Sequence, residues 1–211
     1  MLIINCNEEA LSYLLNIPQE YQEVEYITSS GSQYLNLWFT PPSNYLKTNI
    51  KLYSTQSWDR RAGGIYDGSN RANVHYIWMN NYIWGWFGNN DYQKQSFSTN
   101  TVYQIEMTAN NGNYEIKINW TSYTWTYGGT VQVSTARPYY LFANQENWHA
   151  GENFYWRIYY FKVETSQGVI RDLYACYRKS DGVIGMYDKI NGVFYTNQGS
   201  GSFTKGPNYK R

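Results

Sequence analysis

The hydrophobic and polar residues of the chain follow the two-residue period of β-strands. Residues 154–163 are the longest run of strand-forming residues, and they contain no Gly, Pro, Asn or Asp. Alternate residues of a strand share a face, which predicts this grouping: Tyr159, Phe161 and Val163 on one face, Ile158 and Tyr160 on the other. Because both faces are apolar, we expect a central strand that is covered on both sides.

A hairpin with one buried and one wet face is predicted for residues 103–120. Its turn is Asn110-Asn111-Gly112, and polar residues separate the apolar ones on both sides of it. The apolar positions are Tyr103, Ile105, Met107, Tyr114, Ile116, Ile118 and Trp120.

Shorter runs of strand-forming residues, each bounded by turn residues, fill most of the remaining chain. They lie at residues 25–27, 33–37, 45–53, 64–66, 122–126, 130–133, 139–143, 171–177, 183–187 and 193–196. About a dozen short strands joined by tight turns are typical of a sandwich or jelly roll. We therefore predict an all-β chain folded as a two-sheet antiparallel jelly-roll sandwich, with Phe203 anchoring its C-terminal end.

The N-terminal residues have a different pattern. Asn5 and Glu8 have the spacing of a helix capping box, Leu11, Leu14 and Leu15 follow at helical spacing, and Pro18 ends the pattern. One short helix is predicted here, either packed on the sandwich or docked on a neighbouring subunit. We divide the chain into an N-terminal arm or short helix, residues 1–17, and a β-sandwich domain, residues 18–211.

Composition narrows the function classes. The net charge of the chain is +1, and its basic residues are scattered, so no nucleic-acid-binding surface is expected. No apolar run approaches the roughly 20 residues that span a bilayer, so no membrane span is expected. The 24 Tyr and 9 Trp suit strands, and they also suit contact surfaces because each ring has an apolar body and a polar tip.

The sequence gives little indication of a metal site or of redox chemistry. Cys6 and Cys176 are far apart in sequence and form no CxxC pair, which favours two buried free thiols over a disulfide and argues against structural zinc. No cofactor is expected. Calcium is the alternative, because Asn89-Asn90-Asp91 and residues 144–147 offer the oxygen ligands that calcium prefers, although plain polar turns explain the same residues.

Several segments resemble a family of LamG-like, concanavalin A-like sandwich domains. Residues 21–35, YQEVEYITSSGSQYL, are similar to the family's opening motif, and residues 157–163, RIYYFKV, to one of its strands. The closing part is similar in Arg171-Asp172 and in residues 176–188, 191–197 and 199–203. The resemblance covers about residues 18–206, and it implies two facing antiparallel sheets.

The resemblance also implies a setting. Such domains occur in structural proteins of phages and prophages and in surface proteins of gut bacteria, where they have a binding or a structural role. A phage or prophage virion is therefore the expected location, with a bacterial cell surface as the alternative. The expected partners are other virion or surface proteins, further copies of this chain in a homo-oligomer, and a cell-surface glycan. The fold alone does not fix the function.

No catalytic constellation is found in the sequence. A retaining glycosidase needs two carboxylates about 5 Å apart, which related glucanases supply from a Glu-x-Asp-x-x-Glu strand, and the chain lacks that motif. Glu23-Val24-Glu25 is better explained as a solvated edge. His75 and His149 lie in different segments, and neither has a nucleophilic Ser or Cys at a sharp turn nearby in the sequence. The sequence therefore indicates no catalytic triad. We expect that the protein is not an enzyme.

An aromatic hairpin over residues 75–87 is the candidate binding site, because sugar faces stack on aromatic rings while Asn and Asp bond hydroxyls. Alternation puts Tyr82, Trp84 and Trp86 on one face, and Ile83, Gly85 and Phe87 on the other. The tryptophan face is the core, a subunit interface or a glycan site. The candidate glycan-binding residues are Trp78, Tyr82, Trp84, Trp86, Asn89, Asp91 and Trp148.

Overall fold

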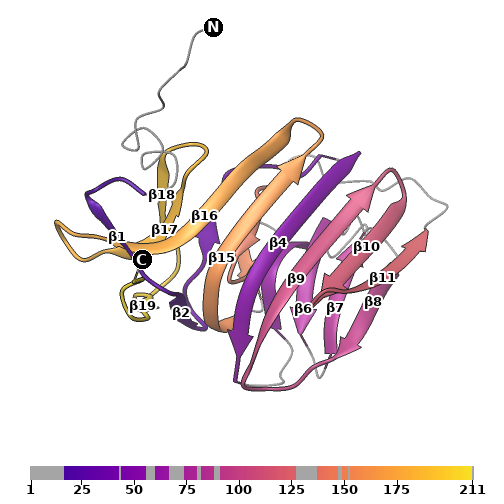
Figure 1. The fold of residues 1–211 in the computed structure, drawn as a ribbon, viewed down its shortest axis with the longest axis horizontal. Helices are drawn as coiled ribbons and strands as arrows, with labels where there is room; N and C mark the ends of the chain where they lie inside the picture. The colour runs from indigo at the N-terminus through magenta and orange to yellow at the C-terminus, as the bar shows by residue number, and fades with distance from the viewer. Residues whose placement is uncertain are drawn as a thin grey trace, which may run out of the picture.

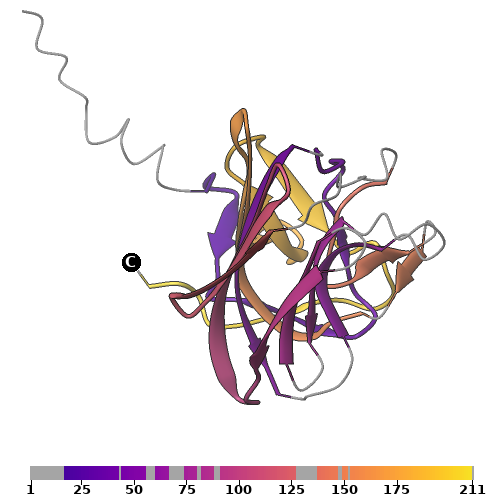
Figure 2. The same cartoon turned by 90° about the vertical axis from the view of Figure 1, so that its right-hand side faces the viewer.

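The computed structural model consists of two β-sheets packed face to face (Figures 1 and 2). It describes residues 17–42, 44–55, 60–66, 74–79, 82–87, 91–126, 137–146, 149–151 and 153–210. The predicted all-β, two-sheet jelly-roll sandwich is confirmed. The predicted helix at residues 5–16 and the predicted strand at 130–133 lie outside the described residues. Within these residues, no helix is long and apolar enough to cross a membrane.

The larger sheet contains most of the long strands, and Figure 1 shows it in front. Its main path, in spatial order, is β11 (Thr121–Thr126), β10 (Asn113–Ile118), β9 (Thr101–Asn110), β4 (Tyr45–Ser54), β15 (Tyr155–Thr165), β16 (Gly168–Arg178), β17 (Ile184–Asp188) and β18 (Val193–Thr196). Beside this path, β1 (Tyr21–Glu23) pairs with β16, while β2 (Ile27–Ser30) pairs with β15 and β19 (Thr204–Lys205). The predicted central strand is confirmed as β15.

The smaller sheet lies behind the larger one. Its main path is β14 (His149–Gly151), β13 (Asn144–Glu146), β5 (Arg60–Tyr66), β6 (Val74–Met79), β7 (Tyr82–Phe87) and β8 (Asp91–Ser96), with β12 (Tyr140–Leu141) joining β5 to β3 (Leu35–Asn36). Two details differ from the prediction. β13 runs parallel to β5, and β5 is longer than the predicted strand at 64–66 because it gains pairing from β6, β12 and β13.

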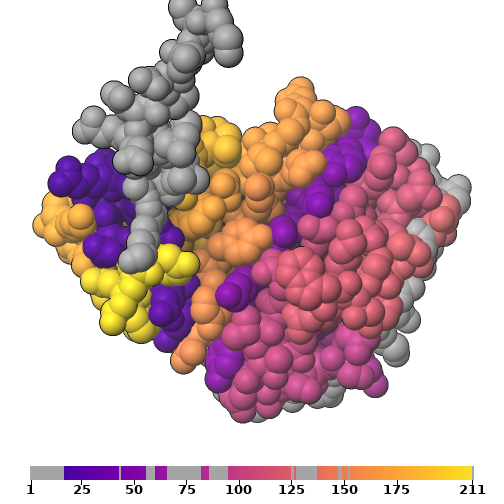
Figure 3. All heavy atoms as spheres, viewed as in Figure 1, coloured from indigo at the N-terminus to yellow at the C-terminus, as the bar shows by residue number. Residues whose placement is uncertain are grey.

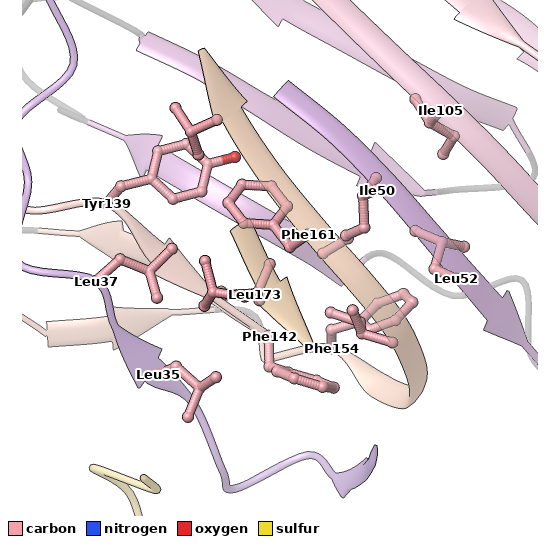
Figure 4. Close-up of a cluster of buried hydrophobic side chains, with 14 of the residues drawn as sticks. Leu35, Leu37, Ile50, Leu52, Ile105, Tyr139, Phe142, Phe154, Phe161 and Leu173 are labelled. Atoms are coloured by element: carbon pink, nitrogen blue, oxygen red, sulfur yellow. The ribbon is translucent and has the colours of Figure 1, made fainter. Parts of the chain in front are cut away.

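The core lies between the sheets and follows the predicted alternation. Ile50 and Ile105 of the larger sheet and Ile65 and Ile83 of the smaller sheet are fully buried there. Tyr139 stacks between two phenylalanines, with ring centroids 5.4 Å from Phe39 and 5.6 Å from Phe161. Figure 4 shows Tyr139 and Phe161 among the aliphatic side chains. Each large side chain buried in this way stabilises the fold by about 1.5–3 kcal/mol.

The opening motif of the sandwich is a hydrogen-bonded corner. Gln33 Oε1 accepts hydrogen bonds from Ser29 Oγ at 3.1 Å and from the backbone nitrogen of Ser30 at 2.8 Å. Its Nε2 donates to the backbone oxygen of Ser200 at 2.8 Å. Gln33 thus ties the start of the sandwich to its end, near Phe203, which is buried as predicted.

The closing motif is organised by one buried carboxylate. Asp188 Oδ1 accepts hydrogen bonds from the backbone nitrogens of Asp172 and Ile190, each at 3.0 Å, and Oδ2 accepts one from Asn191 Nδ2 at 2.7 Å. The Nε of Arg171 lies 3.6 Å from Oδ2. The residues that carry the family resemblance therefore hold the fold together.

The predicted face pattern of β15 is wrong at one point. The register slips between Ile158 and Tyr160, so that Tyr159 is an extra residue in the strand. A bulge of this kind lets two successive side chains leave the sheet on the same side. Tyr159 and Tyr160 are accordingly both half-buried on the outer face, while Ile158 and Phe161 are both in the core. The outer face of β15 is not the covered apolar face that we predicted.

Trp120 is not part of a strand, contrary to the alternation. β10 ends at Ile118, and Asn119 and Trp120 turn the chain into β11 with φ angles of 46° and 74°. Two left-handed residues in succession are typical of a type I′ hairpin turn. Trp120 projects away from the sheet and is 87% exposed.

Cys176 is a buried free thiol, as expected, and burial raises its pKa to about 12. Its suggested disulfide partner Cys6 lies outside the described residues.

Candidate functional site

One face of β7 packs into the core and the other faces outward. Ile83 is fully buried, and Gly85 lies so close to the opposite sheet that a Cβ atom there would be 2.8 Å from Cδ1 of Ile116. Tyr82 and Trp84 alternate with these residues and lie on the outer face, where Tyr82 is 38% exposed. The interpretation that the tryptophan face forms the core is therefore wrong.

The outer face of the smaller sheet carries a ring pair on β7, next to the edge strand β8. The ring centroids of Tyr82 and Trp84 are 6.0 Å apart, at an interplanar angle of 87°. In the register of the sheet, Trp84 stands directly across from Trp78 on one side and from Lys94 on the other. Trp86 follows Trp84 by two residues on the same strand. The side chains of Trp78, Trp86 and Lys94 lie outside the described part of the structure.

The other predicted site residues do not join the aromatic positions in the described structure. Asp91, in β8, stands across from Phe87 and belongs to the alternation of Ile83 and Gly85 instead of that of Trp84. Asn89 and Trp148 lie outside the described residues. The structure therefore brings together Trp78, Tyr82, Trp84 and Trp86 as positions of one sheet, but it separates Asp91 from them in register.

A polar edge beside β5 was not predicted as part of a glycan site, although its residues 144–146 were considered as calcium ligands. Arg61 is only 8% exposed and stands across from Trp78 in the register. Asn144 and Gln145 of β13 are buried, and the nitrogen and oxygen atoms of their amides have no hydrogen-bond partner within the described residues. Such orphaned amides are uncommon in folded proteins. The signal in the sequence is a run of polar residues directly after the apolar segment 139–143.

Gly151 closes this edge. It pairs with Asn144, and a side chain at this position would collide with the carboxylate of Glu146 and would come within 3.0 Å of Asn144 Oδ1. Two acceptor oxygens therefore lie against the same glycine. Carboxylate and amide oxygens accept hydrogen bonds from hydroxyl groups. The edge thus supplies polar chemistry on the sheet that carries the aromatic pair.

The residues considered for calcium do not assemble into an acidic cluster in the described part of the chain. No group of three or more His, Cys, Asp or Glu residues lies together in those ranges. Of the expected ligands, Asn89, Asn90 and Asn147 lie outside them.

Comparison with known proteins supports the fold. No protein-family model matches the chain, and no curated protein sequence does. Among solved structures, the chain is similar to a Bacteroides ovatus protein named as a proposed carbohydrate-binding protein, with a TM-score of 0.62, 12% identity, and coverage of 87% of this chain and 60% of the other.

Two other similar structures come from different settings. Domains LG4–5 of the mouse laminin α1 chain have a TM-score of 0.53 and 10% identity, and the match covers 90% of this chain and 47% of theirs. The enzymatically active domain of tailspike protein 2 of bacteriophage CBA120 has a TM-score of 0.54 and 10% identity, with 77% of this chain and 33% of that chain covered.

These likenesses show that the chain shares the two-sheet β-sandwich fold of these proteins. The fold that the family resemblance implies is thus confirmed, while membership of that family stays a prediction. The chain spans 60%, 47% and 33% of the length of these three proteins.

Proposed function

We propose that the chain is a non-enzymatic module that binds a glycan through the outer face of its smaller sheet. The observation that carries this proposal is the orientation of β7. Its core face is filled by Ile83 and Gly85, which places the ring pair Tyr82–Trp84 on the outer face of the sandwich. A sugar stacks its apolar C–H face on such rings, and buried polar neighbours fix its orientation.

The setting we propose is a phage or prophage virion, with a gut-bacterial surface protein as the alternative. The likeness to a phage tailspike domain supports the first, and the likeness to a Bacteroides ovatus protein proposed to bind carbohydrate supports the second. In both settings the module acts by contact with a cell-surface glycan and is carried in an assembly with other proteins or further copies of itself.

A glycan array with the purified chain tests the proposal. We expect binding to one sugar class and a loss of about tenfold or more in affinity in Trp84→Ala, because a ring contact is worth about 0.5–1.5 kcal/mol and further packing is lost with it. Trp120→Ala is the matched control, because it removes an exposed tryptophan from the edge of the larger sheet.

Two outcomes would contradict the glycan-binding role. One is unchanged glycan binding in Trp84→Ala. The other is silence on the array together with a fall in solution mass in the same variant, which would make the aromatic face a subunit interface. Turnover of a β-glucan that is lost on substituting one acidic residue would refute the non-enzymatic role.

A further inference from the structure

The outer face of the larger sheet contains a hollow of about 450 Å³ where two central strands separate. β15 and β16 pair from Tyr160–Tyr174 to Thr165–Gly168. On the N-terminal side of Tyr160, β15 pairs with β2 instead, and from Cys176 onward β16 pairs with β1. The two strands therefore separate here, in a fork that the residues between β1 and β2 cross. The volume lies within the range of small-molecule sites. Figure 3 shows the contributing segments side by side: β1 in indigo, β15 and β16 in orange, and the C-terminal residues in yellow.

The bulge in β15 brings two tyrosines to this hollow. A regular strand would send either Tyr159 or Tyr160 to the core, but the slipped register places both on the outer face, and both line the hollow with Tyr174. Lys51 Nζ lies 5.0 Å from the ring centroid of Tyr159. Bulges often aim a side chain at a binding site. Here the result is a wall of tyrosine rings along the hollow.

One carboxylate in the hollow lacks the partner that its burial requires. Asp172 Oδ1 is buried without a hydrogen-bond partner within the described residues, and Oδ2 receives only the long bond from Tyr174 Oη, at 3.5 Å. Lys162 stands directly across from Asp172 in the register, yet its Nζ makes no ion pair or hydrogen bond in the described part of the chain. Asp172 and Lys162 thus both line the hollow, and in the described part of the chain one carboxylate oxygen and the ammonium group make no hydrogen bond.

The charges around the hollow select the kind of occupant. Its lining combines the carboxylates of Glu23, Glu25 and Asp172 with the amines of Lys51 and Lys162. An anionic ligand would meet the three carboxylates, and a cationic ligand would meet the two amines. A neutral polyhydroxyl ligand avoids both conflicts, because a hydroxyl group donates to a carboxylate and accepts from an ammonium group.

From this geometry we infer that the fork between β15 and β16 binds one neutral pyranose unit, stacked on the tyrosine wall with its hydroxyls between Asp172 and Lys162. The inference goes beyond the proposed function, since it assigns a second sugar site on the opposite face of the sandwich. It does not depend on the site at Trp84.

The carboxylate of Asp172 works against the stability of the folded chain. Burial raises the pKa of Asp172 above 3.8, and Asp188 adds to this, while Lys162 and Lys189 lower it. The folded state therefore holds this proton to a higher pH than the unfolded state does. Stability is lost as the pH rises from about 3.8 through the folded pKa, and the full penalty is present above the folded pKa. A destabilising carboxylate in a hollow is typical of a functional site.

A protein-observed NMR titration of the full chain tests the inference. The probes are the methyl glycosides of glucose, galactose, mannose and N-acetylglucosamine, with sialic acid and glucosamine as charged counterparts. We expect a neutral glycoside to shift the amide signals of Tyr159, Tyr160 and Tyr174 saturably. Asp172→Asn should weaken this binding about tenfold or more, as the loss of a charged acceptor does. Asp181→Asn, at an exposed turn, is the matched control.

The thermal stability of the same variants separates a binding role from a structural one. We expect Asp172→Asn to have a higher Tm than the wild type at pH 7, and the gain to shrink at pH 3. Trp84→Ala should leave the shifts on β15 and β16 unchanged, so failure of one site is distinguishable from failure of the other. Unchanged binding in Asp172→Asn, stronger binding of either charged sugar, or no shift with any neutral glycoside would overturn the inference.

Discussion

At the scale of single residues, Asp188 is the side chain on which the closing motif depends most. In the described part of the chain, its hydrogen-bond and ion-pair partners are all donors: two backbone nitrogens, the Asn191 amide and the guanidinium of Arg171. Asp188→Asn would set an NH₂ group against these donors and leave Arg171 without its ion pair. We expect a loss of about 3 kcal/mol in the free energy of unfolding.

Urea unfolding measures this loss. Asp181→Asn serves as the control, because Asp181 pairs with Arg178 at 2.6 Å on the exposed surface, where ion pairs contribute little. If Asp188→Asn unfolds at the same urea concentration as the wild type, the buried carboxylate does not hold the motif. Motif residues such as Asp188 serve to hold the fold together. They therefore indicate the fold and carry no information on the ligand.

At the scale of elements, the turn between β10 and β11 contains a local conflict. The φ angle of Trp120 is 74°, a left-handed conformation that a bulky L-residue adopts at a cost, and this turn position usually holds glycine. Since Trp120 is 87% exposed, it gains little burial in return. Trp120→Gly should raise the free energy of unfolding by about 1 kcal/mol.

Trp120→Ala separates backbone strain from the loss of the ring, because alanine retains the Cβ atom that makes the conformation costly. Chemical denaturation of both variants should rank Gly above Ala. Equal stability of the two would show that the backbone at this position is not strained.

Elements also show where sequence patterns succeed and fail. β9 and β10 were predictable because apolar and polar residues alternate through Tyr103–Met107 and Tyr114–Ile118. β5 was not, since its polar, glycine-rich sequence becomes a strand only by pairing with three neighbours. The bulge at Tyr159 was equally hidden, because a slip of register depends on the partner strands and not on the residues of β15.

The candidate sites also differ in how far the sequence predicts them. Clustering of aromatic residues predicted the hairpin of β6 and β7, but both of its faces are apolar, so only the packing of Ile83 and Gly85 against the other sheet decides which one is the core. The hollow at Asp172 joins residues from β1, β4, β15, β16 and the C-terminal segment. Sites assembled from segments so distant in sequence have no local signature.

At the scale of the whole molecule, the two ends of the sandwich belong to the same sheet. β2 pairs with β15 and with β19, and β1 pairs with β16. Phe203 reaches back into the core, where its ring centroid is 4.9 Å from that of Phe142. Removing one contact at the C-terminal end should therefore weaken the whole sandwich.

Differential scanning calorimetry of Phe203→Ala tests this connection. We expect the wild type to unfold in one transition whose calorimetric and van't Hoff enthalpies agree, as two-state domains do. The variant should lose about 3–5 kcal/mol, and its entire transition should move to lower temperature without splitting. Phe194→Ala, a half-buried ring in β18, is the control and should shift the transition less. A second transition, or an early loss confined to the C-terminal strand, would show that residues 18–211 do not fold as one domain.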